Sequence, residues 1–283
     1  MEFKFFNFQP EYTAELNLNH SAWLGHYSFG YDLVVNMKPR ILVELGTYYG
    51  NSFFSFAQAV KDKNLVTKLI AVDTWQGDKH AQFYGEEVLK RVQLIKKKYF
   101  SQQKIELLKM TFDQALNSVE NNSVDILHID GLHTYDAVKH DFESWYPKIS
   151  KNGIILLHDI CEKKDDFGVY KLWDELKARY HTIQFNHSSG LGIVFMGEVK
   201  QFNMPSKKFL QAHYEVMAQM VLQTYDQIKL TNDLSQENSM LKNRSQHLEG
   251  VIQDQNVALR TLERIRNNRF YKILNGIRHF FLH

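Results

Sequence analysis

The sequence predicts an α/β fold, with a seven-stranded, mostly parallel sheet covered by helices on both faces and followed by a helical tail. Over the first 200 residues, short apolar runs alternate with segments of helix length, as in repeated βαβ units. Only residues 186–192 separate the last two runs, too few for a crossover helix, so the final strand should be antiparallel. The four prolines are Pro10, Pro39, Pro147 and Pro205, and a tail without this helix breaker follows.

The elements follow one another in a simple order. Residues 1–39 form a predicted helical lead-in, and residues 40–200 form the predicted main domain. With 44% hydrophobic residues the chain can bury a sizeable core. The seven predicted strands are short β-rich runs at 41–45, 69–72, 105–108, 124–129, 154–157, 182–185 and 193–196.

Charge and cysteine content limit the classes of partner and compartment. Residues 1–199 carry 22 Lys and Arg against 25 Asp and Glu, and residues 200–283 carry 12 against 7. A mildly acidic main domain argues against a nucleic-acid binder and assigns the basic character to the tail. The single cysteine, Cys161, and the lack of a recognisable leader predict that the protein is located in the reducing cytoplasm. Any contact with a membrane is expected to be peripheral, at the inner membrane face.

The tail divides into two predicted segments. Residues 206–263 are expected to be helical, with leucines at 234, 241, 248 and 262 in a seven-residue step. Gln255 and Gly250 interrupt this pattern, so a homo-oligomeric coiled coil and a single amphipathic helix packed on the domain both remain open. Residues 264–283 mix basic and apolar residues at helical spacing and predict a basic amphipathic helix that contacts either an anionic membrane or a protein.

A glycine turn follows the first predicted strand. It comprises residues 44–50, Glu-Leu-Gly-Thr-Tyr-Tyr-Gly, and precedes a helical stretch that begins near Ser52. Glycines at such a turn let a ligand approach the backbone, and the helix N-terminus offers free N–H groups. The spacing differs from the G-x-G-x-x-G pattern of dinucleotide sites, so it indicates a different nucleotide-shaped ligand, although a plain tight turn is the alternative.

Asp73 ends the second predicted strand in the motif Asp73-Thr74-Trp75. A carboxylate at this edge of the sheet can accept hydrogen bonds from both ribose hydroxyls of an adenosyl ligand, whereas the alternative role is a helix cap. Met110, Thr111 and Phe112 follow the third strand and either line the adenine or belong to the ordinary core and loop.

Carboxylates and imidazoles follow the next two strands. Asp130 and His133 come after the fourth strand, and His158-Asp159 follow the fifth. Adjacent parallel strands bring Asp130, His158 and Asp159 to one edge, a set that suits Mg²⁺ or Mn²⁺, with Fe²⁺ also possible. Such a cation would orient a substrate's oxygens, and neutral His133 would serve as general base. In the alternative, His133 only satisfies its loop and the carboxylates cap helices.

Several motifs together resemble the glycan-associated class I methyltransferases, which are related to the macrolide and aminocoumarin sugar O-methyltransferases. The resemblance covers about residues 20–197 and includes the turn at 44–50, Asp73-Thr74-Trp75-Gln76-Gly77-Asp78, residues 129–135 and Leu157-His158-Asp159. It also includes residues 141–145, 167–169, Leu172-Trp173 and Gly190-Leu191-Gly192. It implies a Rossmann-like methyltransferase sheet at residues 40–200, with S-adenosyl-L-methionine (SAM) as cofactor.

The resemblance also implies roles for individual residues. It places SAM at Glu44, Gly46, Gly50 and Asp73. The remaining residues of the predicted cofactor site are Thr47, Ser52, Thr74, Trp75, Thr111 and Phe112. It places Mg²⁺ at Asp130 and Asp159, with His158 where the sugar-modifying relatives carry an Asp. Those relatives have an acidic base where this chain has Leu132, so His133 is expected to take over that role, with Asp78 and His80 near the acceptor or in a solvated loop.

The predicted activity is therefore O-methylation of a sugar hydroxyl in a surface polysaccharide or its precursor, such as a nucleotide sugar or a lipid-linked sugar. One alternative is a non-catalytic scaffold that retains the fold and acts through its coiled-coil and basic tail. A metal-dependent hydroxylase on a similar scaffold is the other alternative.

Overall fold

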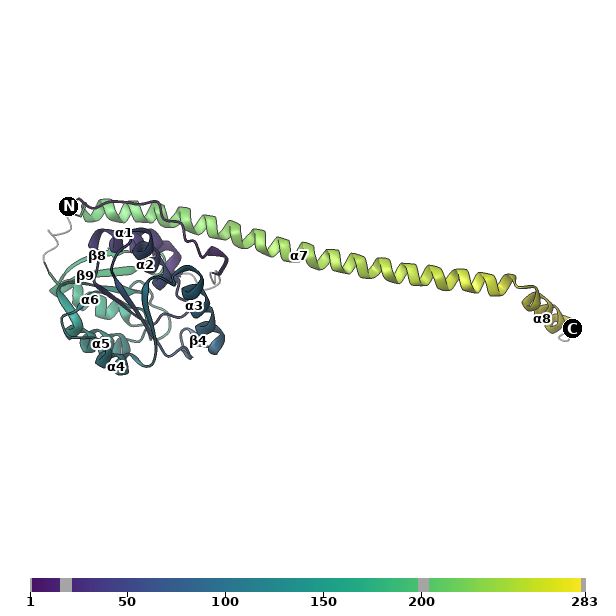
Figure 1. Cartoon of the computed structure of the whole chain (residues 1–283), viewed down its shortest axis with the longest axis horizontal. Coiled ribbons are helices and arrows are strands. Elements are labelled where there is room, and N and C mark those ends of the chain that lie inside the picture. Colours follow the sequence, from purple (N-terminus) through teal and green to yellow (C-terminus); the bar gives the residue numbers. More distant parts are fainter. Residues whose placement is uncertain (1, 16–21, 198–203, 281–283) are drawn as a thin grey trace. The chain divides into compact units, whose positions relative to one another are not determined.

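The computed structural model describes residues 2–15, 22–197 and 204–280 (Figure 1). Parts of three predicted segments lie outside these ranges: residues 1 and 16–21 of the lead-in, residues 198–200 of the main domain, and residues 281–283 of the basic helix. The chain divides into two compact units, Met1–Tyr225 and Asp226–His283.

The first unit is built on the predicted seven-stranded sheet. Its strands are β1 (Ile41–Leu45), β2 (Lys68–Asp73), β5 (Lys104–Lys109), β6 (Val124–Ile129), β7 (Ile149–His158), β8 (His181–Phe185) and β9 (Leu191–Phe195). They lie in the order β5-β2-β1-β6-β7-β9-β8, with β9 antiparallel to both of its neighbours. The predicted fold class, including the antiparallel last strand, is confirmed. The order reverses between β1 and β6, which is where open α/β sheets bind ligands.

Helices cover both faces of the sheet (Figure 1). On one face lie α5 (Tyr135–Trp145) and α6 (Val169–Arg179), whose apolar residues share a core with alternate residues of the central strands, such as Val43, Leu127 and Leu157. On the other face lie α1 (Tyr27–Met37) and α2 (Asn51–Asp62), where Phe56 packs on the His128 ring. Because side chains alternate along a strand, Glu44, His128 and His158 belong to this second face.

The remaining elements of the first unit are short or peripheral. Helix α3 (Glu86–Tyr99) precedes β5, and α4 (Phe112–Ala115) follows it with a capping box formed by Thr111 and Gln114. A small antiparallel pair, β3 (Gly77–Asp78) and β4 (Gln82–Phe83), lies between β2 and α3 and was missed in the sequence. The short 3-10 helices are Thr13–Glu15, Ala22–His26, Leu116–Ser118 and Tyr146–Lys148.

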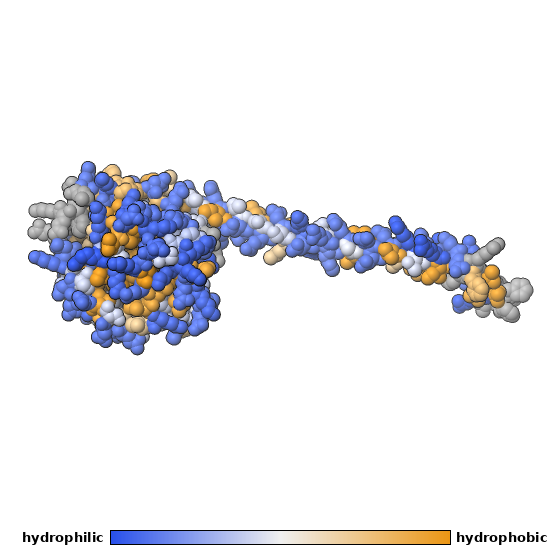
Figure 2. All heavy atoms as spheres, in the orientation of Figure 1, coloured by the Kyte–Doolittle hydropathy of each residue, from blue (hydrophilic) through white to orange (hydrophobic). Residues whose placement is uncertain are grey.

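The predicted helical tail is present as α7 (Lys207–Asn267) and α8 (Arg269–Phe280). The first turns of α7 belong to the first unit and bury Leu210, Tyr214, Ala218 and Tyr225. Every side chain from Lys229 to Asn268 is exposed, and Figure 2 shows hydrophobic side chains distributed between hydrophilic ones along this part of the helix. Within the described ranges, none of the helices combines the length and apolar character needed to cross a bilayer.

Candidate active site

A pocket of about 540 Å³ opens at the carboxyl ends of β1, β2, β6 and β7. Its lining joins the glycine turn after β1, Asp73 at the end of β2, and the polar residues that follow β6 and β7. Its volume falls within the range of pockets that hold small ligands and cofactors. The glycine turn and Asp73, which the sequence predicts to grip one cofactor, therefore face the same open space.

The glycine turn depends on two glycines in the left-handed region of backbone conformation. Gly46 has a φ of +90°, and a Cβ there would lie 2.1 Å from the Asp130 carbonyl oxygen. Gly50 has a φ of +82° and precedes the first residue of α2. Both positions therefore require glycine, and the turn lets the backbone of Thr47 and Tyr48 line the pocket.

Asp73 is fixed beside this turn by backbone donors. Its Oδ2 accepts a hydrogen bond from the Tyr48 N–H at 2.8 Å, and its Oδ1 accepts one from the Trp75 N–H at 2.6 Å. Burial raises the pKa of Asp73, while these backbone donors oppose the rise. Because each carboxylate oxygen has two acceptor sites, Asp73 can hold the turn and still accept hydrogen bonds from a ligand in the pocket.

Most of the predicted cofactor residues line the pocket. They are Gly46, Thr47, Ser52, Asp73, Thr74, Thr111 and Phe112. Three others do not: Gly50 shapes the turn, Trp75 donates its indole N–H to the Tyr48 carbonyl at 3.0 Å, and Glu44 is fully buried beneath it. Glu44 Oε2 lies 2.9 Å from His128 Nδ1. Burial raises the pKa of Glu44, and the hydrogen bond with His128 opposes that rise.

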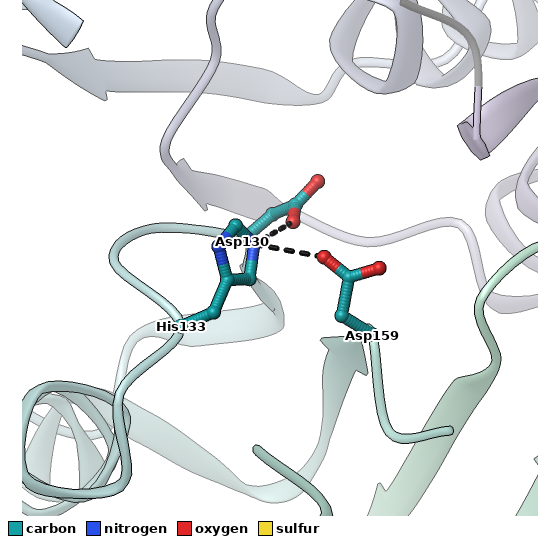
Figure 3. Close-up of side chains that lie close together, drawn as sticks. All are labelled: Asp130, His133 and Asp159. Atoms are coloured by element: carbon teal, nitrogen blue, oxygen red, sulfur yellow. Dashed lines mark hydrogen bonds and ion pairs between the residues drawn. The ribbon is translucent and has the colours of Figure 1, made fainter. Parts of the chain in front are cut away.

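Asp130, His133 and Asp159 form a cluster at the far end of the pocket (Figure 3). His133 Nε2 lies 2.8 Å from Asp159 Oδ2 and 3.4 Å from Asp130 Oδ1. One ligand atom from each residue lies within 4.8 Å of the other two. Asp159 has a φ of +60°, so the backbone turns sharply as β7 ends and the carboxylate faces the loop that carries His133.

His158 approaches the same carboxylates from the side of α1 and α2. Its Nδ1 lies 3.3 Å from Asp130 Oδ1 and 3.5 Å from Asp159 Oδ1. The ring packs edge-on against Trp23 and His26, and its buried Nε2 has no hydrogen-bond partner in the described structure. Both imidazoles therefore contact the carboxylate pair, with His133 completing the compact three-residue cluster and His158 lying outside it.

The charges in this cluster balance without any ion. Burial alone would lower the pKa of His133, but hydrogen bonds to Asp130 and Asp159 outweigh it and raise this pKa to about 9. At His158, burial also lowers the pKa, but the two carboxylates outweigh this effect and raise the pKa well above its ordinary value. The pKa of Asp130 is held well below its ordinary value, and that of Asp159 is also lowered. Near neutral pH two carboxylates thus face two imidazolium groups.

The donor set also fits a divalent cation. The two carboxylates are hard oxygen ligands, as Mg²⁺ or Mn²⁺ prefers, and the His133 imidazole lies beside them. Because ligands bind metal in their deprotonated form, a cation here would displace the imidazolium proton of His133 and take over its stabilising role. When bound, the cation would act as a Lewis acid and hold acceptor oxygens.

Three residues that the sequence left without a firm role lie together beside His133. Asp166 forms an ion pair with Lys79, and its Oδ1 lies 2.6 Å from His80 Nε2. The neighbouring Phe167 ring stacks on His133, with centroids 4.8 Å apart, and contacts His80 at 4.5 Å. We call His80, Asp166 and Phe167 the clasp. It joins the turn between β3 and β4 to the loop before α6, above His133.

The sequence carried a partial signal for the clasp. His80 was expected either near the acceptor or in a solvated loop, and the structure places it in the pocket lining with Phe167. Trp23, Tyr48 and Tyr84 also line the pocket, although none of them was predicted to do so. Tyr48 lies within the predicted glycine turn, and Trp23 lies before the predicted main domain. A single aromatic residue has no spacing pattern that would distinguish a position in a pocket from one in the core.

Part of the chain is similar to a known protein family. Residues 43–160 match the family model described as a methyltransferase domain. This stretch runs from β1 to the end of β7 and contains the glycine turn, Asp73, Asp130, His133 and Asp159. The matched stretch thus includes most of the residues that line the pocket.

Two curated relatives align with part of the chain. An uncharacterized protein of Sinorhizobium fredii is 49% identical over 181 residues, which cover 63% of this chain and 20% of that protein. An uncharacterized protein of Acanthamoeba polyphaga mimivirus is 28% identical over 120 residues, 41% of this chain and 50% of that protein. The chain thus matches about a fifth of one relative's length and half of the other's.

Solved structures are similar to part of the chain at low identity. One is a putative O-methyltransferase from Klebsiella pneumoniae, with 16% identity and a TM-score of 0.48 over 68% of this chain and 92% of that one.

Proposed function

We propose that this chain transfers the methyl group of SAM to a sugar hydroxyl, in a surface polysaccharide or in a nucleotide-sugar or lipid-linked precursor, with the assistance of a divalent cation. One observation carries this proposal: a single pocket joins the glycine turn and Asp73 to the Asp130, His133 and Asp159 cluster. A cofactor held at the first end and a hydroxyl held at the second would meet within it.

The two ends of the pocket supply different parts of the reaction. The backbone of the glycine turn and the Asp73 carboxylate bind and orient the adenosyl part of SAM. Asp130 and Asp159 would hold the cation, which would supply Lewis-acid chemistry to the acceptor oxygens. In-line transfer then needs only the alignment of the sulfonium methyl with the hydroxyl and the removal of one proton.

His133 is the proposed proton acceptor. The acceptor oxygen forms a bond to the methyl carbon while the carbon–sulfur bond breaks, which leaves S-adenosylhomocysteine, and the hydroxyl proton passes to a neutral His133. Asp159 orients the imidazole through the 2.8 Å contact to Nε2. His133 is neutral once the bound cation has replaced the imidazolium charge between the carboxylates.

The acceptor side of the pocket suits a hydroxyl-rich molecule. Asp78, His80, Glu162 and Lys164 line it together with the aromatic ring of Phe167. Polar groups placed around one apolar ring are typical of sites that fix a polar ligand in one orientation. These contacts support the sugar class of acceptor, which the sequence resemblance also favours.

The experiment is a methyl-transfer assay with labelled SAM and panels of glycan fragments and nucleotide sugars, with and without a chelator. Labelled product on a sugar hydroxyl, lost with chelator and restored by Mg²⁺ or Mn²⁺, is the expected result. Absence of SAM binding in calorimetry at millimolar cofactor would overturn the proposal. The double variant Asp130→Ala and Asp159→Ala should lack activity, whereas a scaffold protein would keep its cellular phenotype.

We further propose that the protein works in the cytoplasm and that α8 contacts the anionic inner membrane face. Phe270, Ile273, Leu274 and Ile277 are exposed at helical spacing on this helix, which also carries Lys272 and Arg278. Flotation with vesicles containing anionic lipid should carry the full chain but not a chain ending at Asn268. Equal flotation of the two would remove this part of the proposal.

A further inference from the structure

The exposed part of α7 carries a regular apolar row. Leu234, Leu241 and Leu248 recur every seven residues and are each at least 50% exposed. Leu262 resumes this row after Gln255, whereas Ile252 and Leu259 occupy the facing positions of the same repeat, and all three are exposed to a similar degree. A long helix gains most of its stability by burying an apolar face, so this row needs a partner.

The heptad frame can be chosen from the charges. If the leucines at 234, 241, 248 and 262 occupy position d, position a holds Thr231, Asn238, Ser245, Ile252 and Leu259. In the only other frame that keeps these leucines in the core, the facing row would contain Glu237 and Arg244. Burying those two charges without partners would be strongly unfavourable, so the first frame holds.

This frame makes the helix complementary to itself. Position g holds Glu237 and Arg244, and position e of the following heptad holds Lys242 and Glu249. In a parallel, in-register pair of helices, g of one chain faces e five residues later in the other. Glu237 then meets Lys242 of a second copy and Arg244 meets its Glu249, and no like charges meet at the remaining g and e positions of residues 230–263.

The polar core residue Asn238 fits the same arrangement. In a parallel, in-register pair, the a positions face one another, so the two Asn238 amides can hydrogen-bond to each other. In an antiparallel pair an a position faces a d position, so Asn238 would lie against a leucine with its amide unsatisfied, except in the register that places it against Gln255. A buried Asn at position a is the best-attested device for fixing the register and number of strands in a coiled coil.

We propose that residues 230–265 of α7 bind the same segment of a second copy of this chain as a parallel, in-register, two-stranded coiled coil. The interface contains the a and d rows flanked by the Glu237 to Lys242 and Arg244 to Glu249 pairs. The inference is independent of the proposed methyl transfer, because none of these residues lines the active-site pocket.

Cysteine cross-linking in the full chain tests the orientation. Cys161 is the chain's single cysteine, so Cys161→Ser provides the background. Leu241→Cys places a thiol at d, where the two copies would face each other within disulfide distance. Mild oxidation should give a covalent dimer with this variant and not with the matched control Met240→Cys, which places the thiol at position c.

The other outcomes of this experiment contradict the proposal. Equal cross-linking of the two variants would show that the thiols meet only by collision. Cross-linking that requires a mixture of Leu241→Cys chains with Ser245→Cys or Ile252→Cys chains would show an antiparallel pair. A monomer at all concentrations up to about 100 µM in sedimentation equilibrium would remove the interface.

Charge reversal tests the partner-facing pairs. Glu237→Lys turns two attractive pairs of the dimer into repulsive ones and should weaken dimerisation about 3- to 10-fold. The double variant Glu237→Lys with Lys242→Glu should restore it, with circular dichroism used to check that both remain helical. If the single reversal has no effect at low salt, or the double variant stays as weak as the single one, the in-register pairing is wrong.

Discussion

His133 Nε2 lies 2.8 Å from Asp159 Oδ2, so the carboxylate that ends β7 holds the imidazole of the loop after β6. If His133 removes the acceptor proton, His133→Ala should lower kcat about 10²- to 10⁴-fold and leave SAM binding unchanged. His140→Ala is the matched control, because this exposed histidine pairs with Asp113 and does not line the pocket. A fall of similar size in both variants, or none in His133→Ala, would reject the role of general base.

The metal should bind through Asp130 and Asp159. Asp159→Asn removes one anionic ligand, so calorimetry should show Mg²⁺ or Mn²⁺ affinity falling at least about 10-fold. Asp165→Asn is the control, because Asp165 is an exposed acidic residue in the loop that follows and lies outside the cluster. Cation binding that is equal in the wild type and in Asp159→Asn would place the ion elsewhere.

The ends of the strands were the most predictable part of the site. Apolar runs end at Asp73, Asp130 and Asp159, and parallel strands bring their carboxyl ends to one edge of a sheet. The sequence therefore predicted the residues after β2, β6 and β7 that line the pocket. The alternation of side chains along a strand would also have placed Glu44 and His158 on the same face of the sheet as His128. This position explains why Glu44 is buried beneath the pocket.

The clasp could not be predicted because it depends on contacts between distant residues. Asp166 contacts Lys79 and His80, which lie 87 and 86 positions earlier, and no local pattern encodes such a pair. The β3 and β4 strands have two residues each and are too short to show a strand period. In α7, by contrast, Leu210, Tyr214 and Ala218 are spaced four apart, a signal that would have placed the first turns of the helix on the domain.

SAM binding should depend on Asp73. In Asp73→Asn the side chain keeps one oxygen acceptor, so it cannot serve both the Tyr48 and Trp75 N–H groups and a ligand as well. We expect the Kd for SAM to rise at least about 10-fold, together with a loss of about 1 kcal/mol in unfolding free energy. Calorimetry and thermal unfolding measure the two effects. Unchanged SAM affinity would mean that Asp73 only supports the turn.

The clasp should affect the acceptor more than the cofactor. Phe167→Leu keeps an apolar side chain but removes the ring that stacks on His133 and contacts His80. We expect the KM for the acceptor to rise about 3- to 10-fold with SAM affinity unchanged, since a stacked ring contributes about 1 kcal/mol. Steady-state kinetics with each substrate varied in turn separates the effects. An increase confined to the KM for SAM would contradict the position assigned to Phe167.

The stability of the first unit should fall as the pH rises from 5 to 8, and Asp32 should be one cause. Asp32 Oδ2 accepts a hydrogen bond from the Tyr214 hydroxyl at 2.8 Å, and Oδ1 accepts one from the Phe6 N–H. Burial raises the pKa of Asp32 from 3.8 to about 7, although these donors oppose the rise. A carboxyl whose pKa is higher in the folded state stabilises it fully below the unfolded pKa and ceases to do so above the folded pKa.

Asp32→Asn removes this titration and leaves a side chain of the same shape that can still accept the Phe6 N–H. Urea unfolding at pH 5 and pH 8 should show that the wild type loses about 2–3 kcal/mol more than the variant between the two values. Burial also raises the pKa of Asp141 to about 7. Asp141 therefore adds equally to the pH dependence of the unfolding free energy in both proteins, and its effect cancels in the comparison. Equal losses would mean that Asp32 is ionised in the folded protein, so that Tyr214 and Phe6 donate to a carboxylate throughout this range.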